Sequence, residues 1–215
     1  EAAELINTAK KPYIIFGQGV ILSEAEAELR ALVEKSGIPA AWTLLGLSAM
    51  PTDHPLNVGM VGMHGNYGPN VLTNECDVLI ALGMRFDDRV TGNLATYAKQ
   101  AKVIHFEIDS AEVDKNVKTT VAVLADLKES LTALLPLIEK NSHESWHNEF
   151  KEKYKIELEA VINDELKPKK EGISMGETIE MINKHSKGDA IMVSDVGQHQ
   201  MFTCRYSKFN QTKSN

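Results

Sequence analysis

Short apolar runs alternate with helical patterns through the first 138 residues, and this alternation limits the folds available to the chain. The runs fall at residues 13–16, 39–45, 77–82, 102–109 and 121–124. The Asn-Gly, Asp-Gly and Gly-Gly dipeptides typical of tight β-hairpins are absent between them. Strands joined through helices run parallel, because a parallel connection needs a long crossover. The sequence therefore predicts an α/β fold, with a doubly wound parallel sheet covered by helices on both faces.

Charge and cysteine content exclude several classes of protein. The 215 residues carry 23 basic and 30 acidic side chains, with no basic stripe for a nucleic-acid backbone. No apolar run approaches the roughly 18 residues of a membrane span. Cys76 and Cys204 lie far apart without metal-ligand spacing, which favours reduced thiols in a cytoplasmic protein. We therefore expect no nucleic-acid partner and no membrane segment.

The most informative turn follows the apolar run at 77–82. Residues 83–92 read Gly-Met-Arg-Phe-Asp-Asp-Arg-Val-Thr-Gly, with two acidic and two basic side chains between the glycines. A strand that ends at a glycine leaves these charges at the carboxyl edge of a sheet, where open α/β folds bind ligands. A solvated charged turn explains the same pattern equally well.

Two further turns contain glycines that would let a ligand approach the backbone. Gly17 and Gly19 follow the first strand and could present amides to a phosphate. They do not form a GxGxxG fingerprint, because Leu22 occupies the third glycine position. A plain tight turn explains these two glycines about as well. Ser23 is expected to cap the next helix. Residues 50–65 are predicted to be irregular, and their glycine-rich end is typical of a functional or mobile loop.

Several polar side chains near these turns have two explanations. His64 is a candidate catalyst, although a lone histidine is more often a structural hydrogen-bonding residue. Asp109 could accept hydrogen bonds from ribose hydroxyls or cap the helical turn that follows it. Asp126 is expected to open a helix that runs to about residue 138. A polar helix is predicted near residues 94–99.

The pattern changes at residue 141. Large apolar side chains then recur every fourth position among glutamates and lysines, which predicts an amphipathic helix. This stripe consists of Trp146, Phe150, Tyr154 and Leu158. We expect the stripe to pack against protein rather than against a cofactor.

A second, partial α/β unit is predicted after this helix. Its elements are a helix at 175–185, a strand at 190–195 and a turn into another helix at 196–201. The expected domains are residues 1–140, a helical linker at 141–171 and a truncated domain at 172–215. The missing initiator methionine and the abrupt last element indicate a piece of a longer protein.

Four segments in the same order resemble the acetolactate (acetohydroxyacid) synthase catalytic-subunit family of thiamine-diphosphate enzymes. Residues 83–92 resemble the flavin-contacting segment of that family. The other segments are Val-Gly-Met-His-Gly at 61–65, Ile-His-Phe-Glu-Ile-Asp at 104–109 and Asp-Val-Gly-Gln-His-Gln-Met at 195–201. The general thiamine-diphosphate family shares the fold, and Asp-Asp-Arg-Val-Thr-Gly at 87–92 favours this branch.

The resemblance implies a three-domain flavoprotein, of which this chain would hold the central Rossmann-like domain, with a six-stranded sheet, and the start of the third. Enzymes of that family decarboxylate pyruvate on thiamine diphosphate and Mg²⁺, and join the product to a second 2-ketoacid in branched-chain amino acid biosynthesis. FAD is bound without net redox change. The expected partners are a second copy, or more, of the same subunit and a small regulatory subunit.

The resemblance also implies what this chain lacks. The catalytic glutamate of the family would lie in the first domain, and the magnesium motif would follow residue 215. No catalytic residue and no metal ligand is therefore assigned here, and the resemblance implies that the chain has no synthase activity by itself.

The resemblance assigns cofactor contacts to residues in the turns and strand ends described above. For FAD they are Gly17, Gln18, Gly19, Thr43, Leu44, Met63, His64, Gly65, Gly83, Arg85, Asp87, Arg89, Val90, Glu107, Ile108 and Asp126. For thiamine diphosphate they are Val196, Gly197, Gln198 and His199. The residues that resemble the substrate channel are Met63, Asp88 and Arg89.

Two other functions remain compatible with the sequence. One is the central domain of another thiamine-diphosphate 2-ketoacid decarboxylase or oxidase. The other is a stand-alone dinucleotide-binding module with no link to thiamine.

Overall fold

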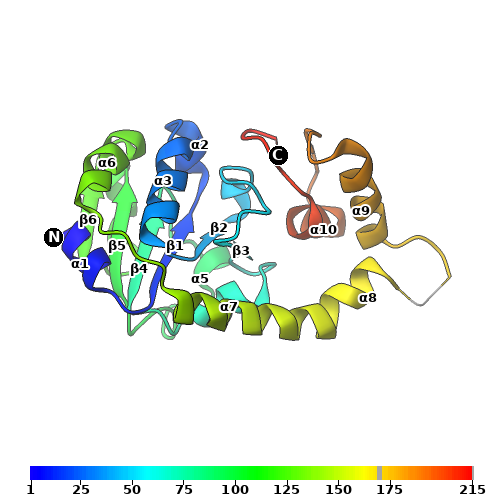
Figure 1. Cartoon of the computed structure of the whole chain (residues 1–215), viewed down its shortest axis with the longest axis horizontal. Coiled ribbons are helices and arrows are strands. Elements are labelled where there is room, and N and C mark those ends of the chain that lie inside the picture. The colour runs from blue at the N-terminus through cyan, green and yellow to red at the C-terminus, as the bar shows by residue number, and fades with distance from the viewer. Residues whose placement is uncertain (169–170, 215) are drawn as a thin grey trace.

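A six-stranded parallel sheet forms the core of the computed structural model, which describes residues 1–168 and 171–214 (Figure 1). Lys169 and Lys170 of the predicted linker lie outside the described residues. The strands are β1 (Pro12–Phe16), β2 (Ala40–Trp42), β3 (Asn57–Met60), β4 (Val78–Leu82), β5 (Lys102–Glu107) and β6 (Val121–Leu124). Their order is β3-β2-β1-β4-β5-β6, and every pair is parallel. The predicted α/β class and parallel sheet are confirmed.

β1 and β4 lie side by side at the centre, where the chain changes its direction of travel across the sheet. After β1 it builds β2 and β3 on one side, and it then returns to place β4 on the other. Phe16 pairs with Leu82 at the ends of these two strands. Both strands are buried along their whole length, which explains their continuous apolar sequences. The chain continues to one side of the sheet after β1 and to the other side after β4, as at the switch points where open α/β sheets bind ligands.

Alternate side chains of β1 face two apolar layers. Ile14 and Phe16 pack in the layer that contains buried residues of α3 and α6, whereas Tyr13 and Ile15 pack in the layer that contains residues of α4 and α7. The α-helices of the sheet region are α1 (Ala2–Thr8), α2 (Gln18–Leu22), α3 (Glu26–Ser36), α4 (Tyr67–Leu72), α5 (Asp88–Thr91) and α6 (Leu127–Leu134). The linker helix is α7 (Glu144–Glu157). Helices therefore cover both faces of the sheet.

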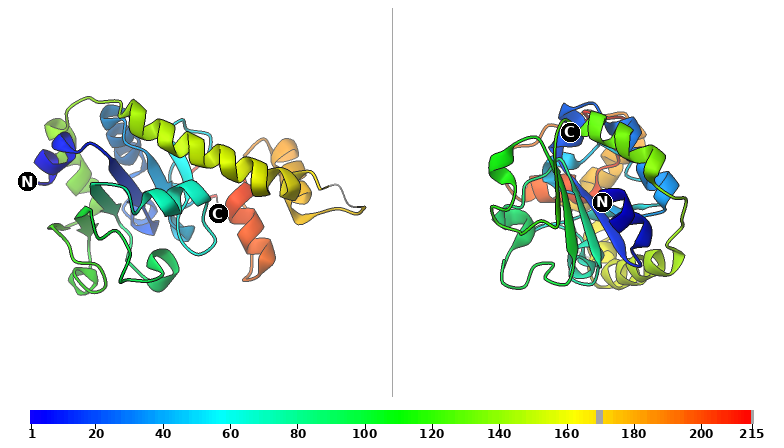
Figure 2. Two further views of the ribbon diagram at one scale, coloured as in Figure 1. Left: turned by 90° about the horizontal axis from the view of Figure 1, so that it is seen from below. Right: turned by 90° about the vertical axis from the view of Figure 1, so that its left-hand side faces the viewer.

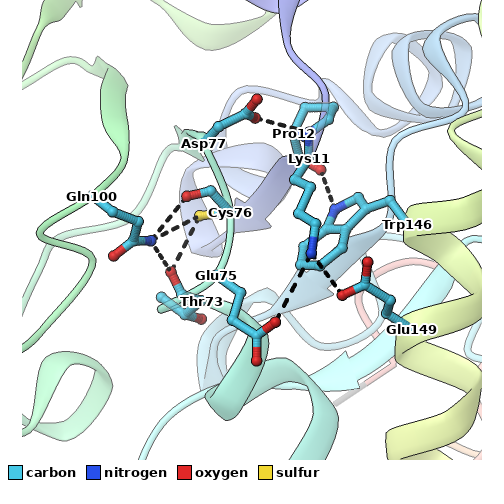
Figure 3. Close-up of polar contacts among 9 residues, drawn as sticks. All are labelled: Lys11, Pro12, Thr73, Glu75, Cys76, Asp77, Gln100, Trp146 and Glu149. Atoms are coloured by element: carbon cyan, nitrogen blue, oxygen red, sulfur yellow. Dashed lines mark hydrogen bonds and ion pairs between the residues drawn. The ribbon is translucent and has the colours of Figure 1, made fainter.

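A cluster at the start of β1 fixes α7 to the sheet (Figure 3). The indole Nε1 of Trp146 donates a hydrogen bond of 2.8 Å to the carbonyl oxygen of Pro12. The Nζ atom of Lys11 lies 4.8 Å from the centre of the Trp146 ring and 2.8 Å from a carboxylate oxygen of Glu149. Because β1 begins here, the cluster lies at the amino edge of the sheet, opposite the edge at which such sheets bind ligands.

The predicted aromatic stripe of α7 packs against protein over part of its length. Trp146 and Phe150 are buried, whereas Tyr154 is 51% exposed. The reason is geometric, since α7 continues as one long helix past the sheet toward the last two helices (Figure 2). It ends in a π-helical turn, Leu158–Ile162, followed by α8 (Asn163–Leu166).

The last helices are α9 (Met175–Ser186) and α10 (Gln198–Tyr206), but the strand predicted at 190–195 is not formed. A strand needs a neighbour for its backbone groups. Among the described residues, the backbone bond recorded for this segment is the one from Met192 N to Ser214 O, at 2.8 Å. Residues 190–195 are therefore irregular, and the regular structure on either side of them is helical.

Two boundaries around the sheet also differ from prediction. β3 lies within residues 50–65, which were predicted to be irregular, because its sequence Asn-Val-Gly-Met has weak strand propensity and pairing with β2 determines its conformation. The strand predicted at 39–45 is shortened to β2, since a 3₁₀ turn, Leu44–Gly46, follows it.

Two predicted helical features are wrong. Ser23 does not cap the next helix, because α2 begins directly after Gly17 and the Ser23 hydroxyl donates to the carbonyl oxygen of Gly19 at its end. The helix α3 begins three residues later, at Glu26. Residues 94–99 form turns instead of the predicted polar helix.

Candidate functional site

The residues assigned to FAD all lie at the carboxyl edge of the sheet. Gly17, Gln18 and Gly19 follow β1, and Thr43 and Leu44 follow β2. Past the other strands, in chain order, come Met63, His64, Gly65, Gly83, Arg85, Asp87, Arg89, Val90, Ile108 and Asp126, while Glu107 is the last residue of β5. Since the strands are parallel, six separate loops emerge on the same side. The structure therefore brings these residues to one edge.

Glycines allow the loops after β1 and β4 to touch at the centre of this edge. The amide of Gly19 donates to the carbonyl oxygen of Gly83 at 2.9 Å. A Cβ atom on Gly19 would lie 2.5 Å from the Cα of Gly83, and one on Gly17 would lie 2.6 Å from the Gly83 oxygen. Gly83 itself has a φ of +55°, which side chains disfavour. These glycines allow close packing between two loops, in agreement with the tight-turn explanation, while the approach of a phosphate stays a prediction.

The loop after β3 is tied to the segment after β4. The amide of Met63 donates to the carbonyl oxygen of Arg89 at 2.8 Å, and the Arg89 side chain reaches the Met63 sulfur at 3.9 Å. Asn70 holds the base of this loop by bonds of 2.8 and 2.9 Å with the backbone N and O of Gly62. Met63 and Arg89, two of the three residues assigned to the substrate channel, are therefore in contact. Asp88 is exposed in the first turn of α5.

Asp87 organises the segment 83–92. One carboxylate oxygen accepts hydrogen bonds from the amides of Arg89 and Val90, at 3.0 and 3.2 Å, and caps α5. Its other oxygen accepts from Nε of Arg85 at 3.2 Å. A carboxylate at a helix start also opposes the positive end of the helix dipole. Asp87 thereby leaves the guanidinium groups of Arg85 and Arg89 on the exposed side of the edge.

The acidic residues at the other strand ends also form local bonds. Glu107 accepts from the amides of Ile108 and Asp109 at 2.8 and 3.2 Å. Asp109 caps the short helical turn that follows it, accepting from Ala111 N at 2.9 Å, so the capping explanation of this residue is confirmed. Asp126 caps α6 as predicted, accepting from Lys128 N at 2.9 Å.

The exposed side chains of this edge suit an amphiphilic anion. Leu44, Met63 and Ile108 are 37%, 60% and 73% exposed, which is unusual for large apolar side chains. The side chain of Arg85 is 68% exposed beside them. A flavin dinucleotide combines flat aromatic rings with a diphosphate, so these residue types fit its two kinds of surface.

Comparison with known proteins identifies the sheet. Residues 1–134 match the family described as thiamine pyrophosphate enzyme, central domain. The chain belongs to this family. It is 43% identical over 209 residues to the acetolactate synthase large subunit of Lactococcus lactis subsp. lactis, an alignment that covers 97% of this chain and 36% of that protein. The resemblance described from the sequence motifs is thus confirmed.

Two further relatives of this thiamine pyrophosphate enzyme central domain come from distant organisms. The probable acetolactate synthase large subunit of Methanocaldococcus jannaschii is 39% identical, over 100% of this chain and 37% of that protein. Acetolactate synthase 2, chloroplastic, of Nicotiana tabacum is 37% identical, over 99% of this chain and 32% of that protein. The chain spans about a third of the length of these relatives. The similarity extends through the linker and the last two helices.

The residues assigned to thiamine diphosphate lie apart from the sheet, in the second unit of this family member. Val196, Gln198 and His199 are exposed, and Gly197 is the residue before α10. A Cβ atom on Gly197 would lie 2.8 Å from the His199 ring. Within residues 1–168 and 171–214, no recorded hydrogen bond or ion pair joins these four residues to the FAD set.

The described part of this thiamine pyrophosphate enzyme domain also contains a cleft outside the set of assigned residues. It has a volume of about 1090 Å³ and lies between β3, α7, α9 and α10. Its lining includes Trp42, Tyr154, Lys184 and Arg205, and none of the residues assigned to FAD or thiamine diphosphate.

The structure adds one supporting residue, His105, that the sequence left unassigned. It is completely buried in β5, with Nε2 2.8 Å from the carbonyl oxygen of Met84 and 3.7 Å from a Glu107 oxygen. Phe86 packs edge-on against its ring, with 5.0 Å between centroids. His105 thereby supports the start of the segment 83–92 through its contacts with Met84 and Phe86. A buried polar side chain inside an apolar strand was the available signal.

Neither cysteine of this family member is activated. Burial raises the pKa of Cys76 to about 12 and that of Cys204 to about 11, so both thiols remain protonated at neutral pH. Among residues 1–168 and 171–214, no group of three or more His, Cys, Asp or Glu side chains could hold a metal ion. None of the helices there is long and apolar enough to cross a membrane.

Proposed function

We propose that this chain binds FAD at the carboxyl edge of its sheet and belongs to an acetolactate synthase large subunit. The observation that carries the proposal is that all the FAD-assigned residues lie at the carboxyl edge of the sheet, with exposed apolar and arginine side chains among them. The names of the relatives support the synthase assignment over another 2-ketoacid decarboxylase. In the whole enzyme, thiamine diphosphate with Mg²⁺ supplies the nucleophilic carbon that decarboxylates pyruvate.

The residues of this chain would bind and orient FAD. Arg85 and Arg89 would neutralise the diphosphate or polarise the flavin edge, because Asp87 fixes the backbone from which both extend. Leu44 and Met63 would cover ring surface and exclude water. Met63 and Arg89, already in contact, would form one wall of the route by which the 2-ketoacids enter. Asp88 would flank that route as an exposed charge.

Titration of the chain with FAD tests this role directly. We expect saturable quenching of flavin fluorescence by the unmodified chain. Arg89→Gln should weaken FAD affinity by about tenfold or more, since a hydrogen bond to a charged group contributes about 1.5–3 kcal/mol. Arg30→Gln, which changes an exposed arginine of α3, should leave the affinity unchanged. Equal losses in both variants, or no quenching at all, would reject the edge site.

The chain by itself is expected to bind without catalysing. The carboxylates of Asp87 and Asp126 are engaged in helix caps, and that of Glu107 accepts backbone amides, so the acidic residues of the FAD set serve the local fold. We therefore expect no acetolactate from pyruvate when the purified chain is supplied with thiamine diphosphate, Mg²⁺ and FAD. A measurable turnover in this assay, absent from a heat-denatured control, would contradict the proposed division of roles.

A further inference from the structure

One buried carboxylate joins the sheet region, the linker and the last helix. Glu157 is the final residue of α7 and is 5% exposed. Its two oxygens accept hydrogen bonds from Tyr67 N at 2.9 Å, Asn66 Nδ2 at 3.3 Å and Arg205 Nη2 at 2.5 Å. These donors lie 90, 91 and 48 residues away along the chain. We call this group of four residues the Glu157 latch.

The burial of the latch makes it energetically different from the other ion pairs of α7. Lys155 and Glu152 also pair, at 2.8 Å, but their side chains are 64% and 67% exposed. Such exposed pairs contribute little to stability, because water and salt screen them. A buried carboxylate instead depends on its partners, and removing one of them leaves an uncompensated charge. Arg205, with a side-chain exposure of 18%, depends on Glu157 in the same way.

The sheet side of the latch leads directly to the FAD-assigned loop. The side-chain oxygen of Asn66 accepts from the backbone amide of Met60, the last residue of β3, at 2.9 Å. The backbone amide of Asn66 donates to the carbonyl oxygen of Met60 at 2.8 Å. Residues 61–65 form the loop that these two bonds close. Tyr67 begins α4 immediately after it. Glu157 therefore fixes the exit of the loop that carries Met63.

The other side of the latch leads to the residues assigned to thiamine diphosphate. Arg205 lies in the last turn of α10, a helix of nine residues that begins directly after Gly197. A second bond from the linker reaches the same turn, since the hydroxyl of Tyr206 donates to the carboxylate of Glu165. The C-terminal end of α10 is thus held, and its N-terminal end carries the assigned residues.

The backbone at the latch is also unusual. The helical hydrogen-bonding pattern widens to a π-helix over Leu158–Ile162, directly after Glu157. Turns of this kind are rare and are frequently found at functional positions. Here the π-helix lies between the carboxylate that reaches α4 and α10 and the carboxylate of Glu165 that reaches Tyr206.

From these contacts we propose that Glu157 is a positioning residue that couples the FAD-assigned loop at 61–65 to α10. Order at one segment stabilises the other, because both bind the same buried carboxylate. The coupling is reciprocal, as for any two linked binding equilibria. The naming of the two ligands rests on the proposed function, whereas the coupling between the segments does not.

Hydrogen exchange on the 215-residue chain tests the coupling. Glu157→Gln removes the negative charge. Because both oxygens of Glu157 accept hydrogen bonds, the NH₂ group of the glutamine would face one of these donors in either orientation of the amide. We expect amides of α4 and of α10 both to exchange about tenfold faster or more, while β4 is unchanged. The control Glu152→Gln, on the same helix, should match the unmodified chain. Acceleration limited to α7, uniform acceleration or no change would each overturn the coupling.

A ligand-dependent measurement separates coupling from simple packing. If the unmodified chain binds FAD, the ligand should slow exchange in α10 as well as at residues 61–67. In Glu157→Gln the slowing should persist at 61–67 and disappear in α10, a result that a purely structural role would not produce. Slowing of α10 that survives the substitution would overturn the proposal. If FAD does not bind, the proposed function fails, and the comparison without ligand still decides whether the coupling exists.

Discussion

Gly83→Ala is expected to lower the free energy of unfolding by about 2–5 kcal/mol, the sum of two separate penalties. Gly83 has a φ of +55°, and placing alanine in this left-handed region costs about 1–2 kcal/mol. The new Cβ would also lie 2.7 Å from the Cα of Gly19. That neighbour is backbone in the first turn of α2, so the two segments must separate, at a typical overpacking cost of about 1–3 kcal/mol.

Gly17→Ala provides the comparison for this prediction. Gly17 has a φ of −123°, which any residue can adopt, and a Cβ there would lie 2.6 Å from the carbonyl oxygen of Gly83. It should therefore show the collision between the two loops without the left-handed penalty, and destabilise by about 1–2 kcal/mol less than Gly83→Ala. Urea denaturation followed by circular dichroism measures both. No loss of stability in Gly17→Ala would mean that the contact between the β1 and β4 loops does not limit the packing of the edge.

Burial on both faces decided which strands could be predicted from the sequence. β1 and β4 are buried throughout, and their unbroken apolar runs mark them clearly. β3 contains one glycine and one valine in four residues, so its own sequence gives no clear strand pattern. Its conformation depends on pairing with β2, which a local sequence pattern does not reveal. The segment 190–195 shows the reverse error. Its apolar sequence predicts a strand, but a strand forms only where a neighbouring strand supplies partners for its backbone groups, and residues 190–195 pair with no strand in the described part of the chain.

The candidate site was predictable to the level of which loops meet. Glycines at strand ends locate the carboxyl edge, and the charged segment 83–92 marks its centre. The roles of individual charges were not predictable, because the sequence around a carboxylate such as Asp87 is the same whether the side chain binds a ligand or caps a helix. Glu157 was missed for a related reason. The linker is rich in acidic residues, and the partners that distinguish this one lie 48 to 91 residues away.

Trp146→Ala is expected to be the most damaging substitution in the linker, lowering the free energy of unfolding by about 3–5 kcal/mol. The indole is 2% exposed and packs edge-on against Phe150, with 5.0 Å between ring centroids. Its removal also leaves the carbonyl oxygen of Pro12 without its side-chain donor and Lys11 without the aromatic face above which it lies. Because α7 connects the sheet to α9 and α10, the loss should loosen the linker before the sheet itself unfolds.

Tyr154→Ala distinguishes this explanation from a general effect of shortening aromatic side chains on α7. Tyr154 belongs to the same four-residue repeat in the sequence, but it lies where the helix has passed the sheet and is 51% exposed. Its truncation should change stability by no more than about 0.5 kcal/mol, as surface substitutions usually do. Trp146→Phe should fall between the two, because it keeps most of the packing and removes the bond to Pro12. If thermal unfolding gave the same loss at both positions, anchoring of α7 by the Trp146 cluster would be wrong, since the two residues differ chiefly in their contact with the sheet.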